Sequence, residues 1–253
     1  MEQINIKKYQ TTSKRGNACH IYEDFIIRSE LYYEFLLLKA LKSDGDRIEI
    51  IQDVLHRITA AQILMGDEAQ KILNEPNAGG ASVVSEALSA EYMARRFGAR
   101  DIVTEMAIQY WFPNWKRIDY IATFFGGRVG ISVTRAMGFP YSINFTMDDA
   151  IRLCEKKLNG LIIAKSGISL TCRYERSILH CFCQTEEISN LMLIAFNEMI
   201  ERDKRENPLC PTLKGSITLI LTVCDIREVY TDDLSCIQDN QIYEENIETK
   251  DGR

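Results

Sequence analysis

The amino-acid sequence predicts an α/β fold, in which a mixed central sheet flanked by helices is preceded by an N-terminal helical region. Two observations support this class. Apolar residues recur at helical spacing through the first third of the chain. Farther on, helical patterns alternate with apolar or alternating runs typical of strands. Of the 253 residues, 46% are hydrophobic, which is enough to bury a sizeable core.

The first part of the chain, after a polar lead-in, has the spacing of helices. Apolar side chains predict three of them, over residues 29–38, 46–58 and 67–74. The second begins at Asp46, and Glu49 three residues later completes the pattern of a capping box. The segment Asn77-Ala78-Gly79-Gly80 is typical of a linker. We therefore assign residues 1–78 to an N-terminal helical region and place a boundary there.

Residues 79–230 are predicted to form the α/β domain. The expected elements are a helix over 82–97, strands over 101–111, 116–125 and 128–136, a helix over 146–159, strands over 161–164 and 178–183, a helix over 185–205 and a strand over 216–224. Gly126-Gly127 is a hairpin-turn signal between the second and third of these strands. A three-strand meander between two helices is thus the main topological prediction.

The charge of the chain is concentrated at its end. Residues 231–253 hold seven acidic residues against two basic ones, so this segment carries most of the formal net charge of −6. It also lacks apolar periodicity, and we predict an acidic disordered tail over residues 231–253. The rest of the chain is nearly neutral, which neither favours nor excludes nucleic acid as a partner.

Three features bear on the compartment. No window approaches the roughly 18 uninterrupted apolar residues of a membrane span, and the N-terminus lacks the apolar stretch of a signal peptide. The eight cysteines lie in helical or apolar patterns, including Cys181 and Cys183 in a predicted strand, which is typical of reduced cytosolic thiols. We expect an intracellular protein, cytoplasmic or nuclear, with no membrane partner.

The residues that point to chemistry lie on the predicted hairpin. Side chains alternate between the two faces of a strand, so Asp119 can share one face with Ser132 and Thr134 of the next strand. Ile131 and Val133 then belong to the other face. A lone acid near the start of a strand, beside polar positions of a partner strand, is typical of a metal-dependent nuclease.

The order of elements over residues 82–225, together with Asp119, resembles the PD-(D/E)XK (restriction-endonuclease-like) nuclease superfamily. The resemblance implies a restriction-endonuclease-like core and a magnesium ion. An acid on the second strand, an acid-x-lysine pair on the third and often a glutamate on the first helix surround that ion. Asp119 matches the second-strand acid, and Glu86 or Glu91 matches the helix glutamate. The resemblance therefore makes Asp119 and Glu86 the expected metal ligands.

The chain departs from this pattern on the third strand. Ser132 and Thr134 stand where the acid and the lysine belong, and a hydroxyl replaces neither well. Glu105 on the first strand is an alternative acid, while Lys165 and Arg135 are alternative cations. Asp119 also has a plainer interpretation, as an exposed salt-bridge partner of the neighbouring basic residues.

An aromatic segment, Trp111-Phe112-Pro113-Asn114-Trp115, joins the first two strands of the meander. We favour closure of the core at this turn. The alternative is a platform on which nucleic-acid bases stack.

The loss of both members of the acid-x-lysine pair favours a catalytically degenerate, nuclease-like binding or scaffold module. Its partner is nucleic acid or a protein. The alternative is an active nuclease that uses magnesium to hydrolyse DNA or RNA phosphodiester bonds at a rearranged site. The sequence leaves enzyme activity open between the two. Other reaction classes lack support, since the chain contains no G-x-S-x-G, P-loop or G-x-G-x-x-G motif.

Overall fold

The computed structural model describes residues 10–14, 17–30, 32–42, 50–58, 62–75, 82–139, 142–207, 213 and 217–237. Its strands are β1 (Gln10–Lys14), β2 (Asn17–Ile21), β3 (Phe25–Glu30), β4 (Ile50–Arg57), β5 (Arg100–Thr104), β6 (Tyr120–Phe124), β7 (Gly127–Ala136), β8 (Arg176–Cys183) and β9 (Ile217–Cys224). Its α-helices are α1 (Tyr33–Lys42), α2 (Asp67–Asn74), α3 (Val83–Phe97), α4 (Met147–Ser166), α5 (Glu186–Glu206) and α6 (Arg227–Thr231). Three short 3₁₀ turns are η1 (Ser142–Asn144), η2 (Leu170–Cys172) and η3 (Leu234–Cys236).

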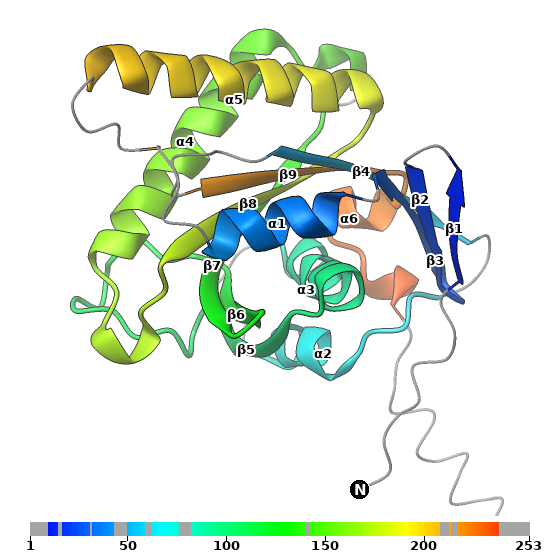
Figure 1. Ribbon diagram of the computed structural model, residues 1–253, viewed down its shortest axis with the longest axis horizontal. Helices are drawn as coiled ribbons and strands as arrows, with labels where there is room; N and C mark the ends of the chain where they lie inside the picture. The colour runs from blue at the N-terminus through cyan, green and yellow to red at the C-terminus, as the bar shows by residue number, and fades with distance from the viewer. Residues whose placement is uncertain are drawn as a thin grey trace, which may run out of the picture.

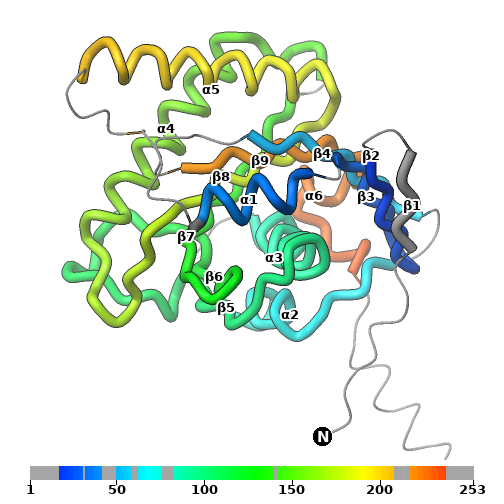
Figure 2. The backbone as a smooth tube through the Cα atoms, viewed as in Figure 1, coloured from blue at the N-terminus to red at the C-terminus, as the bar shows by residue number. Residues whose placement is uncertain are grey.

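All nine strands belong to one mixed sheet, in the order β1-β2-β3-β4-β9-β8-β7-β6-β5. The four central strands β4, β9, β8 and β7 run parallel to one another, whereas the strands on either side of them pair antiparallel. The blue N-terminal strands therefore lie at one end of the sheet and the green strands β5 and β6 at the other (Figures 1 and 2).

Helices cover both faces of this sheet (Figure 1). One core lies between the sheet and α1, α2, α3 and α6, and contains Leu37, Ile72, Tyr92 and Val229. A second core lies on the opposite face, beneath α4 and α5. Three layers with a mixed sheet in the middle are a common way to bury both faces of a sheet. The predicted α/β class, with a mixed central sheet flanked by helices, is confirmed.

The prediction that the N-terminal region is helical is wrong, although α1 and α2 do form. Residues 50–57, expected in a helix over 46–58, form β4, and residues 17–30 contribute two further strands. Along β4 the buried residues alternate, at Ile51, Asp53 and Leu55, which is the period of a strand. Pairing with β3 and β9 satisfies the backbone of β4 and overrides the local helical spacing. The expected capping box at Asp46 and Glu49 lies outside the described residues.

The prediction of a strand over residues 161–164 is also wrong, because α4 continues through Gly160 to Ser166. Its buried positions recur at helical spacing: Ala150, Cys154, Leu158, Leu161 and Ala164. A glycine inside a helix costs about 1 kcal/mol relative to alanine, and the packing of the flanking leucines offsets that cost here. The strand expected over 101–111 is shorter than predicted and ends at Thr104.

The boundaries predicted after residue 78 and at the start of the tail have different outcomes. The boundary after residue 78 lies outside the described residues. The first residues of the expected disordered tail are ordered: α6 ends at Thr231, η3 follows, and Ile237 forms a β-bridge with Ile63. Burial of Cys236 explains this order, since it joins the first core together with Ile226 and Val229. From residue 238 onward the tail lies outside the described residues.

Candidate functional site

The β6–β7 hairpin frames the candidate site. Its tight turn has Phe125 at φ +49° and Gly126 at φ +89°, with Phe124 paired to Gly127. Two successive residues at positive φ are typical of a type I′ turn, which matches the twist of the flanking strands. The turn therefore occurs one residue earlier than the Gly126-Gly127 prediction, and the antiparallel hairpin itself is confirmed.

Asp119 lies immediately before β6 and is bonded to the neighbouring strand. Its N–H donates to the carbonyl oxygen of Ile131 (3.1 Å). Its Oδ2 atom accepts hydrogen bonds from Ser132 Oγ (3.0 Å) and from the Val133 N–H (2.5 Å). Asp119 and Ser132 thus share a face as predicted, while Ile131 and Val133 belong to the core on the opposite face. Thr134 follows two residues after Ser132 and is also buried.

Glu86 of α3 interacts with Asp119 through its charge, although α3 covers the face of the sheet that holds Ile131 and Val133. One carboxylate oxygen accepts a hydrogen bond from Ser82 Oγ (2.6 Å). Burial, together with the negative charges of Asp119 and Glu105, raises the pKa of Glu86 to about 7. The pKa of Glu105 is raised by its own burial and by the charge of Asp119. Three acids from α3, from the end of β5 and from the start of β6 therefore repel one another across one site.

A cation that the sequence analysis missed stands at this site. Lys157 of α4 donates from Nζ to the carbonyl oxygen of Val133 (2.5 Å), the residue whose N–H bonds Asp119. The positive charge of Lys157 also lowers the pKa of Glu86. A signal was present in the sequence, since Lys157 falls at a core-facing position three residues after buried Cys154 and next to buried Leu158.

The two cations considered as substitutes for the missing lysine are engaged elsewhere. Lys165 donates from Nζ to the carbonyl oxygen of Glu175. Arg135 donates from its guanidinium to the carbonyl oxygen of Val229 in α6 (3.2 Å). Of the cations weighed for this role, Lys157 is thus the one that bonds the strand segment holding Asp119.

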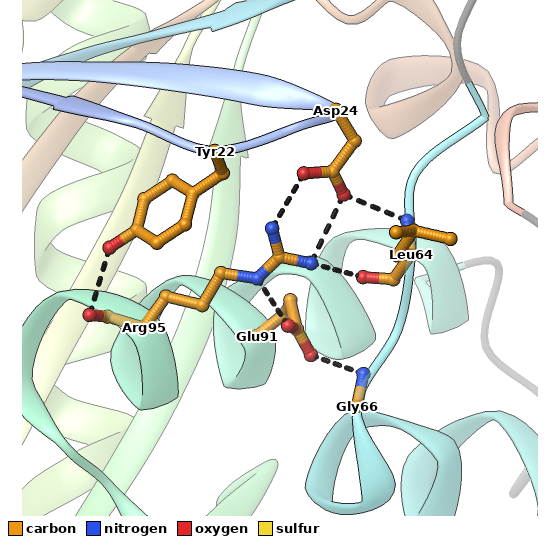
Figure 3. A network of polar contacts seen from close by, with 6 residues as sticks. All are labelled: Tyr22, Asp24, Leu64, Gly66, Glu91 and Arg95. Carbon is orange, nitrogen blue, oxygen red and sulfur yellow. Dashed lines mark hydrogen bonds and ion pairs between the residues drawn. The ribbon is translucent and has the colours of Figure 1, made fainter. Parts of the chain in front are cut away.

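Glu91, the other helix glutamate, has a different environment. Its carboxylate accepts from Arg95 Nε (2.5 Å) and from the Gly66 N–H (2.7 Å). The Arg95 guanidinium also pairs with Asp24 (2.6 Å) and donates to the Leu64 carbonyl oxygen (2.5 Å), as Figure 3 shows. Glu91 therefore ties α3 to the segment before α2 and to the β2–β3 turn. Of the two glutamates, Glu86 is the one whose charge interacts with Asp119. Residues five positions apart on a helix point in different directions, so the two glutamates are not expected to act together.

The oxygen-rich donor set suits magnesium, a hard cation that prefers carboxylate ligands and keeps several of its waters. Asp119 and Glu86 supply two carboxylates, and the Oδ1 atom of Asp119 makes no hydrogen bond within the described residues. As the side chains stand, no group of three or more His, Cys, Asp or Glu among the described residues is arranged to hold a metal ion. An ion bound here would therefore rest on two carboxylates and complete its shell with water.

The aromatic segment closes the core only in part. Trp115 is half-buried and donates from Nε1 to the carbonyl oxygen of Ile163 (2.7 Å), so it packs against α4. Trp111 and Phe112 are 62% and 61% exposed. Core closure, favoured from the sequence, is wrong for these two side chains.

Most of the described thiols, and His180, are buried in the core. The seven described cysteines are free, and Cys181 and Cys183 lie in β8 as predicted, with sulfur atoms 3.8 Å apart. His180 is fully buried, bonded to Ser89 Oγ (2.7 Å) and Thr222 Oγ1 (3.0 Å), and burial lowers its pKa to about 3. Within the described part of the chain, no helix is long and apolar enough to cross a membrane.

Comparisons with known proteins do not identify a function for this site. No protein-family model matches the sequence, and no solved structure matches the fold. Over 136 residues the chain is 32% identical to the AAC-rich mRNA clone AAC4 protein of Dictyostelium discoideum. This similarity covers 51% of the chain and 20% of that much longer protein.

Proposed function

We propose that the chain is a metal-dependent phosphodiesterase of restriction-endonuclease-like fold, acting on DNA or RNA at a rearranged site. The observation that carries the proposal is the meeting of Asp119, Glu86 and Lys157 at the β6–β7 hairpin. Each comes from a different element, and the charges of the other two influence the pKa of Glu86. Ionisable groups that perturb one another in this way are typical of functional sites.

The order of elements supports the proposed fold. From α3 onward the chain forms a helix, an antiparallel meander β5-β6-β7, the helix α4, and the strand β8 parallel to β7. The same order of a helix, a three-strand meander, a helix and a strand underlies the resemblance to the superfamily. Asp119 just before β6 and Glu86 on α3 are the residues for which the resemblance implies a role as metal ligands, and their place in the order of elements is consistent with that role.

Each residue has a distinct proposed role. A divalent cation bound by Asp119 and Glu86 would polarise the scissile phosphate and lower the pKa of a bound water. Ser132 donates to one oxygen of Asp119 and thereby fixes the direction of its other oxygen. The Lys157 amine would replace the lysine that the third strand of the meander lacks. It would hold the attacking water or counter the charge that develops on the phosphate. Glu105 adds negative charge that strengthens cation binding.

The degenerate binding module is the second candidate, and a specific observation favours it. Ser132 and Thr134 are buried where the acid and the lysine belong, and one oxygen of Asp119 is already occupied by two hydrogen bonds. In that case the fold binds its partner without cleaving it.

The experiment that decides between the two is a cleavage assay. The purified protein is incubated with magnesium or manganese and with single- and double-stranded DNA and RNA, beside the variants Asp119→Asn and Asp101→Asn. Asp101 is an exposed acid of β5 at φ +54°, where asparagine is well tolerated, so its variant is the matched control. We expect cleavage by the unaltered protein and by Asp101→Asn, and none by Asp119→Asn. Equal products in all three samples, or none in any, would contradict the proposal in favour of the degenerate module.

A further inference from the structure

The exposed aromatic residues belong to a loop that begins and ends at the candidate site. The loop leaves β5 at Glu105 and returns to β6 at Asp119, and these are two of the three acids that repel one another there. Trp111 and Phe112 lie near its middle. A chain of nucleotides held at Asp119 would therefore meet one end of this loop.

The loop is fastened to the segment that follows α4. The Trp111 N–H donates to the carbonyl oxygen of Gly167 (2.9 Å), and the Ser169 N–H donates to the carbonyl oxygen of Gln109 (3.0 Å). The Trp115 indole donates to the Ile163 carbonyl oxygen and packs so closely that a Cβ atom on Gly167 would lie 2.1 Å from its Nε1. The aromatic residues are thus held in a defined arrangement before any ligand arrives, which reduces the entropy lost on binding.

Two ring faces are available on this rigid loop. Trp111 is 62% exposed and Phe112 is 61% exposed. The Phe112 ring lies 5.7 Å from the Trp115 ring at an interplanar angle of 30°, so Trp115 supports it from within the protein. Two neighbouring exposed apolar side chains on one loop, unlike a single one, form a surface that favours a binding role.

Positive charge lies on the loop and on α4, the helix that it contacts. Lys116 extends over Gly160, where a Cβ atom would lie 3.1 Å from its Cε. Site residue Lys157 is one turn earlier on the same helix. A lysine on the loop and a lysine on the helix that fastens it would attract a phosphate backbone, and the two exposed rings offer stacking surfaces for bases.

We propose that Trp111 and Phe112 form a stacking platform for unpaired nucleobases, which makes a single-stranded segment of DNA or RNA the substrate of the adjoining site. The inference rests on the proposed function, since it names the substrate class of that site. Bases within a duplex stack on one another and do not offer their faces to a protein ring. The platform therefore selects single strands, flaps or unpaired ends rather than continuous duplex.

The test measures binding separately from cleavage. Fluorescence anisotropy with labelled oligothymidylate, oligouridylate and a blunt duplex is recorded in calcium, a hard cation used in place of magnesium or manganese, and again in chelator. Loss of one base-stacking contact costs about 5- to 150-fold in affinity. We expect Phe112→Ala and Trp111→Ala each to weaken single-strand binding by roughly that range and to change duplex binding less than about twofold.

Phe35→Ala is the matched control. Phe35 is 63% exposed, nearly the same as Phe112, but it lies on α1, which covers the opposite face of the sheet. Phe112→Tyr, which keeps a ring face, should bind as the unaltered protein does. Quenching of tryptophan fluorescence by oligothymidylate, present in the unaltered protein and lost in Trp111→Phe, gives a second measurement on folded protein.

The outcomes separate this inference from the proposed function. Ring-dependent single-strand binding without cleavage would overturn the nuclease proposal and leave the platform standing. Cleavage that requires Asp119 but is indifferent to Trp111 and Phe112 would overturn the platform alone. The platform is also wrong if the unaltered protein binds no single strand, if duplex binding falls equally, or if Phe35→Ala matches Phe112→Ala.

Discussion

Lys157 and Val133 are joined by a hydrogen bond from a helix to the strand that it covers, Nζ to carbonyl oxygen, at 2.5 Å. The same Val133 residue donates its N–H to Asp119. One residue of β7 thus fixes the positions of a cation and of a carboxylate that come from different parts of the chain. Ser132 and Thr134 do not supply a charge at this point, and Lys157 does.

The first prediction concerns Lys157. If its amine serves the reaction, Lys157→Gln should slow single-turnover cleavage about 10²- to 10⁴-fold, the usual contribution of a positioned acid–base or charge-stabilising group. Lys156→Gln is the matched control, since Lys156 is the adjacent exposed lysine of α4 and should leave the rate within about threefold of the original. Both variants should bind manganese equally well in a thermal shift assay, because neither removes a carboxylate ligand. A full rate in Lys157→Gln would remove this residue from the proposed mechanism.

The second prediction concerns the pH dependence of stability. Burial and neighbouring acids raise the pKa of Glu86 from 4.5 to about 7, so the folded protein holds a proton that the unfolded chain releases. The stability that this proton provides is complete below the unfolded pKa and is lost as the pH rises through the folded pKa. Replacing Glu86 with glutamine should therefore raise the free energy of unfolding above about pH 7, by an amount on the order of 1–3 kcal/mol, with little effect near pH 4.

Urea denaturation of Glu86→Gln at several pH values measures this effect. Glu23→Gln, at an exposed acid of the β2–β3 turn, is the control and should show no such trend. Manganese should stabilise the unaltered protein most at high pH, where Glu86 is ionised and able to bind the cation. A Glu86→Gln curve parallel to that of the unaltered protein at every pH would show that the acids do not interact as described.

Local signals explain which elements could be predicted from the sequence. Thr146 caps α4 and Thr185 caps α5, each by a side-chain hydrogen bond, and Gly98 ends α3 at φ +67°. These residues fix helix ends through contacts within a few positions. The pairing of Asp119 with Ser132 follows in the same way from strand alternation and a short turn.

The parts that could not be predicted depend on distant partners. β4 pairs with β9, which brings Ile50 opposite Leu219. No residue close to β4 in the sequence indicates that β9 is its partner. Without it, the spacing of its apolar residues fits a helix equally well. Lys157 reaches the site only because α4 packs across β7. Sequence analysis therefore located the acids, which lie on locally determined elements, and missed the cation, which tertiary packing places.

The third prediction separates Glu91 from the site. Glu91 and Arg95 are nearly buried, with side chains 6% and 10% exposed. Removing one partner of a buried pair leaves an uncompensated charge, so Glu91→Ala should destabilise the protein by about 3–5 kcal/mol. Glu201→Ala removes an exposed partner of Lys204, and should cost less than about 1 kcal/mol. Chemical denaturation gives both values, and the cleavage rate per folded molecule should be unchanged in Glu91→Ala. A stable variant without activity would place Glu91 in the site instead.

The fourth prediction compares two glycines near the end of α4. A Cβ atom on Gly167 would lie 2.1 Å from the Trp115 indole nitrogen, whereas one on Gly160 would lie 3.1 Å from the flexible end of Lys116. Gly167→Ala should therefore displace Trp115 and cost about 1–3 kcal/mol by overpacking. In Gly160→Ala the lysine can move aside, and the better helix propensity of alanine should stabilise the protein by up to about 1 kcal/mol.

Thermal denaturation of both variants, followed by tryptophan fluorescence, checks this pair. Gly167→Ala should shift the emission of Trp115 toward that of a solvated indole, because its hydrogen bond to the Ile163 carbonyl oxygen is lost. It should also weaken single-strand binding, since Trp115 supports the Phe112 ring. Gly160→Ala should do neither. If the two variants behave alike, the close packing of Trp115 on Gly167 does not hold the aromatic loop in place.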